Sequence, residues 1–217
     1  MAGGGRAVEV EPERVAGWFD RFAERHGGVA STTATRAQVT VTAADGATAT
    51  CAVPFGPLDT EPGEHPGLAI DPLVAHLLRP RRIGLLLVRL GGHSVGVAEN
   101  GVVASSRTDR RLVHGRSAAG GWSQHRFARR RAGQARESLR AAANAAADVL
   151  LPELSTLDAV VLGGDQQALD NLRTDRRLAP LFARAEPRIL DVPEPRRTVL
   201  DDAAQRARAA EIVIRDH

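Results

Sequence analysis

Residues 81–106 read RRIGLLLVRLGGHSVGVAENGVVASS and carry the clearest signal of the fold. The run 83–90 is almost entirely apolar, which is typical of a strand covered on both faces. A glycine pair follows it, and the tight turn Glu99-Asn100-Gly101 separates the short segments 93–98 and 102–106. We therefore expect three successive antiparallel strands joined by short turns.

The chain downstream of this meander alternates helical and strand patterns. After a polar, glycine-rich stretch without periodicity, which we expect to be a long loop over 108–123, apolar residues recur four and three apart from Ala128 to Val149 and predict a long helix. The remaining expected elements are a strand at 157–162, helices at 166–172 and 175–182, a strand at 188–192 and a helix at 197–210. Strands that first run antiparallel and then alternate with helices predict an α/β (α+β) fold with a mixed sheet flanked by helices.

The first third of the chain predicts a smaller region. Its expected elements are a flexible tail at 1–10, an amphipathic helix at 11–26, a β-hairpin formed by 36–43 and 47–53 around Asp45-Gly46, a surface loop or linker at 54–72 and a short helix at 72–78. We expect two regions, an N-terminal helix and hairpin with its linker at 1–78 and a larger domain at 79–217.

Charge is distributed unevenly along the chain. The total is +3, and all 29 basic side chains are arginine. The window 107–140 holds ten arginines and two acids, a charge of +8 that leaves −5 for the rest of the chain. A solvated helix face is the ordinary explanation of such a run, but its position beside a glycine-rich loop favours a binding site for a polyanion such as RNA.

Several classes of protein are excluded by composition. The longest apolar run, 83–88, is too short to cross a membrane, and the first ten residues lack the apolar core of a secretory signal. A single cysteine, Cys51, excludes an internal disulfide framework and a cysteine-rich zinc site, and is expected to be a small core residue. We expect a cytoplasmic protein.

The segment that carries chemistry is 120–131, GGWSQHRFARRR. The glycines of Gly120-Gly121 let a backbone approach a ligand closely. Gln124 is neutral, so it cannot act as a strong base, but its amide can orient a water molecule or donate a hydrogen bond to an oxyanion. A helix that starts behind it adds a favourable potential for negative charge.

This segment resembles the GGQ loop and the following helix of eukaryotic and archaeal class-I translation release factors, whose pattern is Gly-Gly-Gln-Ser and then Arg-Phe-Ala-Arg. The run Val160-Val161-Leu162-Gly163-Gly164-Asp165 is similar to the strand that follows that helix. The best match is the VLRF-type branch of ribosome quality control, in its short actinobacterial form, over about Arg81 to the C-terminus. In this chain Trp122 and Ser123 stand between the glycine pair and Gln124, so the geometry of the loop must differ from that of release factors.

The resemblance implies an RNase-H-like core and a peptidyl-tRNA hydrolase that needs no metal or cofactor. Its implied partners are the large ribosomal subunit, at the peptidyl-transferase centre, and peptidyl-tRNA, with no membrane and no DNA. The implied catalytic residues are Gln124, Gly120 and Gly121. The residues expected to bind RNA are Arg116, Trp122, His125, Arg126, Arg129, Arg130 and Arg131.

Some of these residues have a second interpretation. His125 invites a role as a base, but a lone histidine at a helix start more often caps the helix or contacts phosphate, and the same holds for His114 in the loop. Trp122 fits base stacking and loop anchoring equally well.

Three other functions stay open at the level of sequence. The same loop could stabilise the transition state of a tRNA endonuclease that cuts near the 3′ CCA end. The arginine window alone would suffice for a non-catalytic RNA- or ribosome-binding module. Gly163-Gly164-Asp165 suggests a phosphate loop of a small-molecule enzyme, but it lacks the spacing of a P-loop, and we interpret it as a turn with a helix-capping aspartate.

Overall fold

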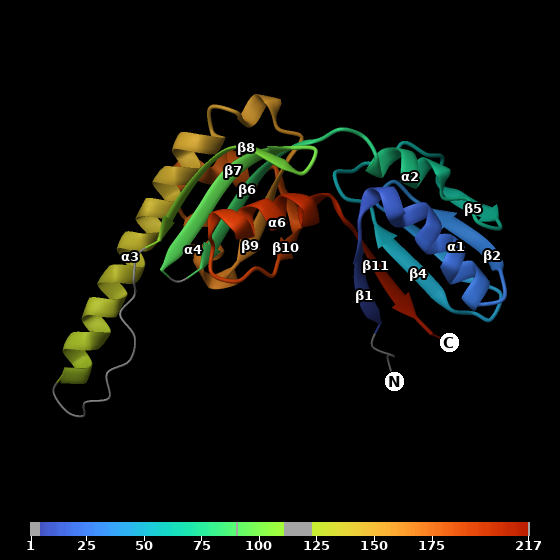
Figure 1. The fold of residues 1–217 in the computed structure, drawn as a ribbon, viewed down its shortest axis with the longest axis horizontal. Coiled ribbons are helices and arrows are strands. Elements are labelled where there is room, and N and C mark those ends of the chain that lie inside the picture. The colour runs from blue at the N-terminus through green and yellow to red at the C-terminus, as the bar shows by residue number, and fades with distance from the viewer. Residues whose placement is uncertain (1–4, 90, 111–122, 217) are drawn as a thin grey trace. The chain divides into compact units, whose positions relative to one another are not determined.

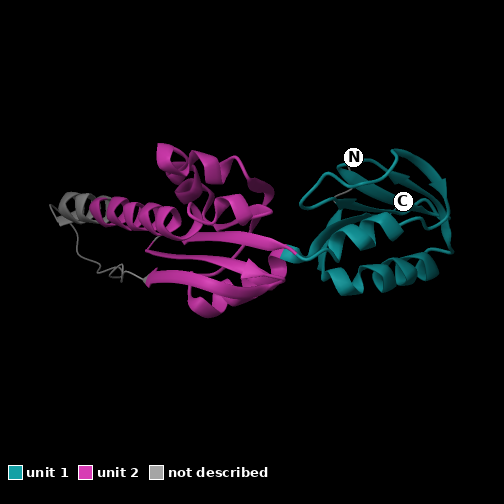
Figure 2. Ribbon diagram, turned by 90° about the horizontal axis from the view of Figure 1, so that it is seen from above, with its two compact units in different colours: residues 1–80, 208–217 teal, residues 81–207 magenta. Residues whose placement is uncertain are grey.

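The computed structural model describes residues 5–89, 91–110 and 123–216, and for residues 110 and 123–132 it describes the backbone alone. The chain forms two compact units (Figure 2): unit 1 comprises residues 1–80 and 208–217, and unit 2 comprises 81–207. None of the helices in the described ranges is long and apolar enough to span a bilayer.

Unit 2 is built on a five-stranded mixed sheet (Figure 1). Its strands are β6 (Arg82–Arg89), β7 (Gly92–Glu99), β8 (Val102–Arg110), β9 (Ala159–Gly164) and β10 (Ala185–Leu190). They lie in the order β10-β9-β6-β7-β8, with β6, β7 and β8 antiparallel and with β9 and β10 parallel to β6. The predicted meander and the mixed α/β sheet are confirmed, whereas the RNase-H-like type of this sheet stays a prediction.

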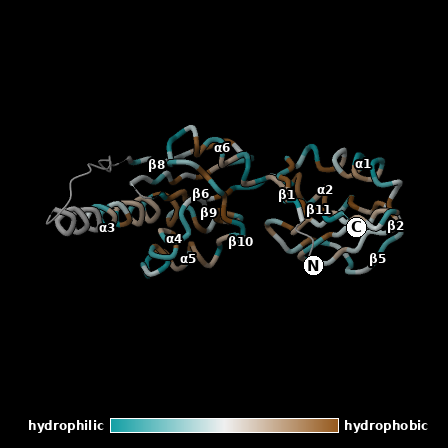
Figure 3. Tube along the Cα trace, turned by 90° about the horizontal axis from the view of Figure 1, so that it is seen from below, coloured by the Kyte–Doolittle hydropathy of each residue, from teal (hydrophilic) through white to brown (hydrophobic). Residues whose placement is uncertain are grey.

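Strand β6 lies at the centre of this sheet because its sequence is apolar on both faces. Residues 83–88 are all buried, and hydrophobic residues fill β6 and its neighbour β9 (Figure 3). Leu86 and Val88 face a cluster that includes alanines of α3 (Ser123–Leu150). On the opposite face, a Cβ added at Gly96 would lie 2.9 Å from the Leu200 Cδ2 atom of α6 (Arg197–Arg208), so α6 packs closely on that side.

The connections of unit 2 follow the predicted turn chemistry. Asn100 and Gly101 form the two-residue loop between β7 and β8, and both have positive φ, 52° and 84°, as a type I′ turn requires. After β9, the Asp165 carboxylate accepts a hydrogen bond from the Ala168 N–H and caps α4 (Gln166–Arg173). The predicted helix-capping aspartate is confirmed. The remaining short elements are η2 (Leu154–Thr156), η3 (Arg176–Leu178) and α5 (Ala179–Phe182).

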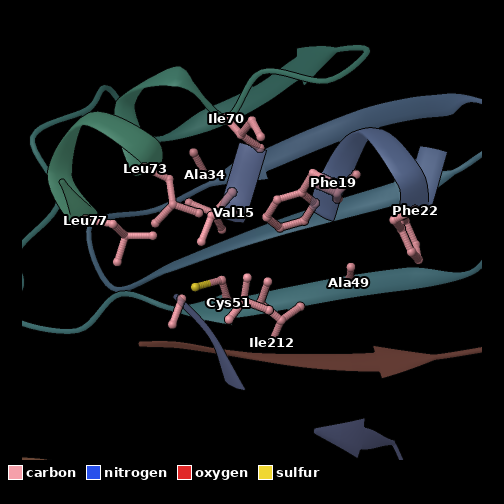
Figure 4. Packing of buried hydrophobic residues seen from close by; sticks show 14 of the residues in the cluster. Val15, Phe19, Phe22, Ala34, Ala49, Cys51, Ile70, Leu73, Leu77 and Ile212 are labelled. Atoms are coloured by element: carbon pink, nitrogen blue, oxygen red, sulfur yellow. The ribbon is translucent and has the colours of Figure 1, made fainter. Parts of the chain in front are cut away.

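Unit 1 is a six-stranded antiparallel sheet packed against two helices. In chain order its elements are β1 (Arg6–Val10), η1 (Pro12–Arg14), α1 (Val15–Arg25), β2 (Val29–Ala34), β3 (Gln38–Ala43), β4 (Thr48–Ala52), β5 (Gly63–Pro66), α2 (Asp71–Leu77) and β11 (Ala210–Arg215). The strand order is β1-β11-β4-β3-β2-β5. In Figure 4 apolar side chains of α1 and α2, among them Phe19 and Leu73, point toward Cys51 and Ile212 on the strands. The predicted hairpin, the short helix and the buried position of Cys51 are confirmed.

Several local predictions are wrong because some segments pair with strands that are distant in sequence. Residues 6–10 of the expected tail form β1, because β11 offers them a partner strand. The expected linker 54–72 contains β5, which pairs with β2. The helix expected at 197–210 ends at Arg208, and the last strand follows it. The region expected at 79–217 therefore differs from unit 2 in its last ten residues, which group with residues 1–80.

Candidate functional site

The candidate site lies where the chain passes from the edge strand β8 to helix α3. Strand β8 continues to Arg110, which pairs with Gly92, and α3 begins at Ser123. The bounds of the loop expected over 108–123 are wrong at both ends, because residues 108–110 pair with β7 and residue 123 belongs to α3. Residues 111–122 between the two elements lie outside the described part of the chain.

The predicted site residues fall on two sides of that boundary. Four of them, Arg116, Gly120, Gly121 and Trp122, lie outside the described residues, as does His114. The other six lie in the first three turns of α3, where the backbone alone is described: Gln124, His125, Arg126, Arg129, Arg130 and Arg131. These six residues lie close to one another along the first part of α3.

The start of α3 gives Gln124 a different setting from the expected loop. Because the helix begins at Ser123, Gln124 and His125 belong to its first turn rather than preceding it. The first four N–H groups of a helix have no intrahelical partner and carry the positive end of the helix dipole. An anionic group or a developing oxyanion is stabilised at such an end.

The C-terminal half of α3 is held firmly on the sheet. Its small side chains allow close approach to β6 and β7, and those that are buried are Ala142, Ala143, Ala145 and Ala146, followed by Leu150. A Cβ added at Gly84 of β6 would lie 3.2 Å from Leu150 Cδ2 and 2.8 Å from Leu157 Cδ1. Gly84 therefore makes room for the end of α3, and an isolated glycine within an apolar strand is the sequence signal of such a close approach.

Polar contacts fix the same half of the helix. Arg107 of β8 donates to the Asp148 carboxylate of α3 at 2.7 Å, and both side chains are more than half exposed. Arg177 of η3 donates to the Asn144 side-chain oxygen at 3.0 Å. Arg177 also contacts Asp175, and this hydrogen bond is the largest cause that lowers the pKa of the Asp175 carboxyl. Exposed pairs contribute little to stability, so the buried residues of α3 provide most of the energy that holds the helix on the sheet.

The described arginines of the window lie at the surface. Arg107, Arg136 and Arg140 are all exposed, and Arg107 is paired with Asp148. Across the described ranges, no group of three or more histidine, cysteine, aspartate or glutamate side chains is arranged to hold a metal ion. Sequence reasoning missed Gly84, Asp148 and Asn144, because residues that position a helix are recognised only once their contacts are known.

The match to a protein-family model shows which family the chain belongs to. The family model of the Actinobacteria/chloroflexi VLRF1 release factor matches residues 81–213, more than half of the chain. The chain belongs to this VLRF1 release-factor family. The predicted family is confirmed, and the matched range contains β8, α3 and every candidate site residue. This membership relates the chain to translation release factors.

Similar solved structures include two archaeal proteins. One, described as an archaeal protein, has 14% sequence identity and a TM-score of 0.40, with 75% of this chain and 48% of that chain covered. The other, the archaeal translation termination factor aRF1, has 15% identity and a TM-score of 0.41, with 77% and 51% covered. This VLRF1 chain spans about half the length of each. No curated protein sequence matches it.

Proposed function

We propose that this VLRF1 protein hydrolyses the ester bond between a nascent peptide and the terminal ribose of tRNA on the ribosome. The observation that carries the proposal is the family match over 81–213, a range that includes the glycine pair and Gln124. A member of a release-factor family with a glutamine after a glycine pair has a side-chain amide that can orient water at the peptidyl-tRNA ester.

Gln124 is the proposed catalytic residue. Its amide is neutral at every accessible pH, so it orients a water molecule and donates a hydrogen bond rather than removing a proton. The water oxygen attacks the ester carbonyl carbon, and the carbonyl oxygen carries the negative charge of the tetrahedral intermediate. The bond to the ribose oxygen then breaks, the peptide leaves with a carboxyl group, and the ribose oxygen takes up the proton that the attacking water gives up.

The surroundings of Gln124 suit this step. The first turn of α3 offers N–H groups that have no intrahelical partner and can donate to a developing oxyanion. Gly120 and Gly121 leave room for the terminal ribose to approach the backbone. The arginines that follow, Arg126, Arg129, Arg130 and Arg131, provide bidentate contacts for RNA phosphates.

Substitution of Gln124 tests the catalytic role. We expect Gln124→Ala to lower the rate of peptide release from ribosome-bound peptidyl-tRNA by about 100- to 1,000-fold, the usual effect of removing one oxyanion donor. The affinity for the ribosome should stay unchanged. The matched control is Gln134→Ala, which removes the same amide from the same helix ten residues downstream and should release peptide at the wild-type rate.

The product of the reaction separates this proposal from its rivals. Ester hydrolysis leaves a tRNA whose CCA end is intact, and sequencing of the tRNA 3′ end reports this directly. A shortened tRNA would show that the protein acts as an endonuclease rather than as a hydrolase. Equal release by Gln124→Ala and wild type would refute the catalytic role of Gln124 and favour an RNA-binding protein.

A further inference from the structure

Unit 1 contains an arginine-lined hollow that lies outside the candidate site. Its volume is about 490 Å³, and it is lined by β1, by α1 with its C-cap residue, and by the end of β11 with the residue after it: Arg6, Trp18, Arg21, Phe22, Arg25, His26, Ile214 and Asp216. All but Ile214 and Asp216 lie within the first 80 residues, which the family model does not match.

The positions of these residues follow from helix and sheet geometry. Trp18, Arg21 and Arg25 are three and four residues apart, so they share one face of α1. Arg6 pairs with Ile214, in register with the pairs Val8–Ile212 and Val10–Ala210. Since Ile212, Val10 and Ala210 belong to the core, every second residue, including Arg6, lies on the sheet face that α1 covers. The three arginines therefore converge from two elements.

The charge in the hollow is not balanced within the protein. Asp216 is the only acidic residue among the described lining residues. The neighbouring carboxylate of Asp45 accepts a hydrogen bond from the Ala47 N–H at 3.0 Å and contacts the ring of His26, itself a lining residue, at 2.8 Å, rather than an arginine of the hollow. Within the described ranges, Arg6, Arg21 and Arg25 have neither an ion pair nor a side-chain hydrogen bond, and all three are exposed. Three unpaired guanidinium groups around one hollow favour an anionic ligand.

An aromatic ring accompanies the arginines. Trp18 is partly buried and stacks on Phe22 with a centroid distance of 5.8 Å and an interplanar angle of 8°. Phe19 meets the same indole edge-on at 5.0 Å. This packing holds the indole in place, while its exposed part lines the hollow. Arginines beside a fixed aromatic surface suit a nucleotide, whose phosphate binds guanidinium and whose base stacks.

We propose that this hollow binds an unpaired segment of ribosomal RNA and docks unit 1 on the ribosome. A volume of about 490 Å³ lies within the range of roughly 300–1,000 Å³ typical of small-ligand pockets, so it admits one or two nucleotides rather than a duplex. Protein contacts to RNA bases are made mostly in such unpaired segments. The choice of ribosomal RNA over an acidic peptide rests on the proposed function, which also assigns the unpaired end of tRNA to unit 2.

The test measures binding of the full-length protein to large ribosomal subunits that carry no tRNA. The double variant Arg21→Glu/Arg25→Glu should bind at least about tenfold more weakly at moderate salt, because two phosphate contacts are replaced by repulsion. The matched control is Arg36→Glu/Arg79→Glu, which makes the same charge change at two exposed arginines of unit 1 outside the hollow and should bind like wild type. Thermal unfolding of both variants verifies that unit 1 is folded.

Three further probes identify the occupant. A fluorescent uridine octamer should lose affinity for the hollow variant and keep it for the control. A hexaglutamate peptide that binds wild type and loses this binding in the hollow variant, while the octamer does not, would overturn the proposal in favour of an acidic protein partner. If the hollow variant loses binding to isolated tRNA but not to the subunit, the RNA that the hollow binds is not ribosomal. If both double variants bind the subunit with equal affinity, the hollow is not a binding site for it.

Failure of this proposal can be told apart from failure of the proposed function. At saturating ribosome concentration the hollow variant should release peptide at the wild-type maximal rate, because Gln124 is intact. Gln124→Ala should show the opposite pattern, with normal subunit binding and slow release. If the hollow variant binds normally and Gln124→Ala releases peptide slowly, the RNA-binding role of the hollow is refuted and the proposed function stands.

Discussion

Cys51 shows how one side chain can govern the response of this protein to alkaline pH. It lies on β4 with no exposed surface, opposite Ile212 of β11. Burial is the largest cause, and the nearby charge of Glu211 a second, of a rise in the pKa of the Cys51 thiol from 9.0 to about 12. The chain contains neither lysine nor tyrosine, and arginine stays charged, so no other side chain titrates in this interval.

This leads to a prediction about stability. In the unfolded chain the thiol ionises above pH 9.0, whereas in the folded chain it stays protonated until about pH 12. The contribution of Cys51 is therefore fully present below pH 9.0 and is lost as pH rises through that interval. We expect the free energy of unfolding to fall by about 1.4 kcal/mol per pH unit within it, as measured by denaturant titration. Cys51→Ala should remove this slope, and an equal slope in wild type and variant would contradict the assignment.

Helix α3 combines two functions at its two ends. Its C-terminal half is anchored by buried alanines and by Leu150, which packs against Gly84, and it also carries the Arg107–Asp148 pair. Its N-terminal half carries the arginines of the candidate site. An anchored helix of 28 residues spans about 42 Å at 1.5 Å per residue, so the sheet fixes the direction in which the site is presented.

The arginines of α3 predict a salt dependence of ribosome binding. The triple variant Arg129→Ala/Arg130→Ala/Arg131→Ala should flatten the plot of log affinity against log salt by about 2, since each lost phosphate contact contributes roughly 0.7 to 0.9 to the slope. Binding to the large ribosomal subunit at several salt concentrations measures it. The control replaces three exposed arginines outside both proposed sites, Arg14, Arg36 and Arg79, by alanine and should keep the slope. A flat response in wild type would refute phosphate contacts by these residues.

Elements with strong local patterns were predictable from sequence, and elements that depend on a distant partner were not. Strand β6 is an apolar run, and the turns at Asp45-Gly46 and Asn100-Gly101 carry their own conformational signal. Strands β1 and β5 are short edge strands, and their partners β11 and β2 are distant from them in sequence. For the candidate site, the helix and its arginines were visible as a pattern, whereas its first residue and its anchoring contacts depend on tertiary packing.

At the scale of the whole molecule, unit 2 is inserted between two parts of unit 1. Residues 1–80 precede it, and the last ten residues return to pair with them. Strand β11 lies between β1 and β4, so it completes the sheet rather than extending its edge. The family match ends at residue 213, within β11, and thus includes part of a strand whose sheet is formed by residues outside the match.

This arrangement predicts that the two units respond differently to loss of the C-terminus. Deletion of residues 208–217 removes β11 together with the buried side chains of Ala210 and Ile212, so β1 and β4 lose their shared partner. We expect amide protection by hydrogen exchange to collapse throughout unit 1 and to persist in β6, β7 and β9 of unit 2. The milder change Ile212→Ala should lower the free energy of unfolding of unit 1 by about 2–5 kcal/mol. Deletion of residues 216–217 alone leaves β11 whole and should preserve protection, whereas full protection of β1 after removal of 208–217 would show that unit 1 does not need its last strand.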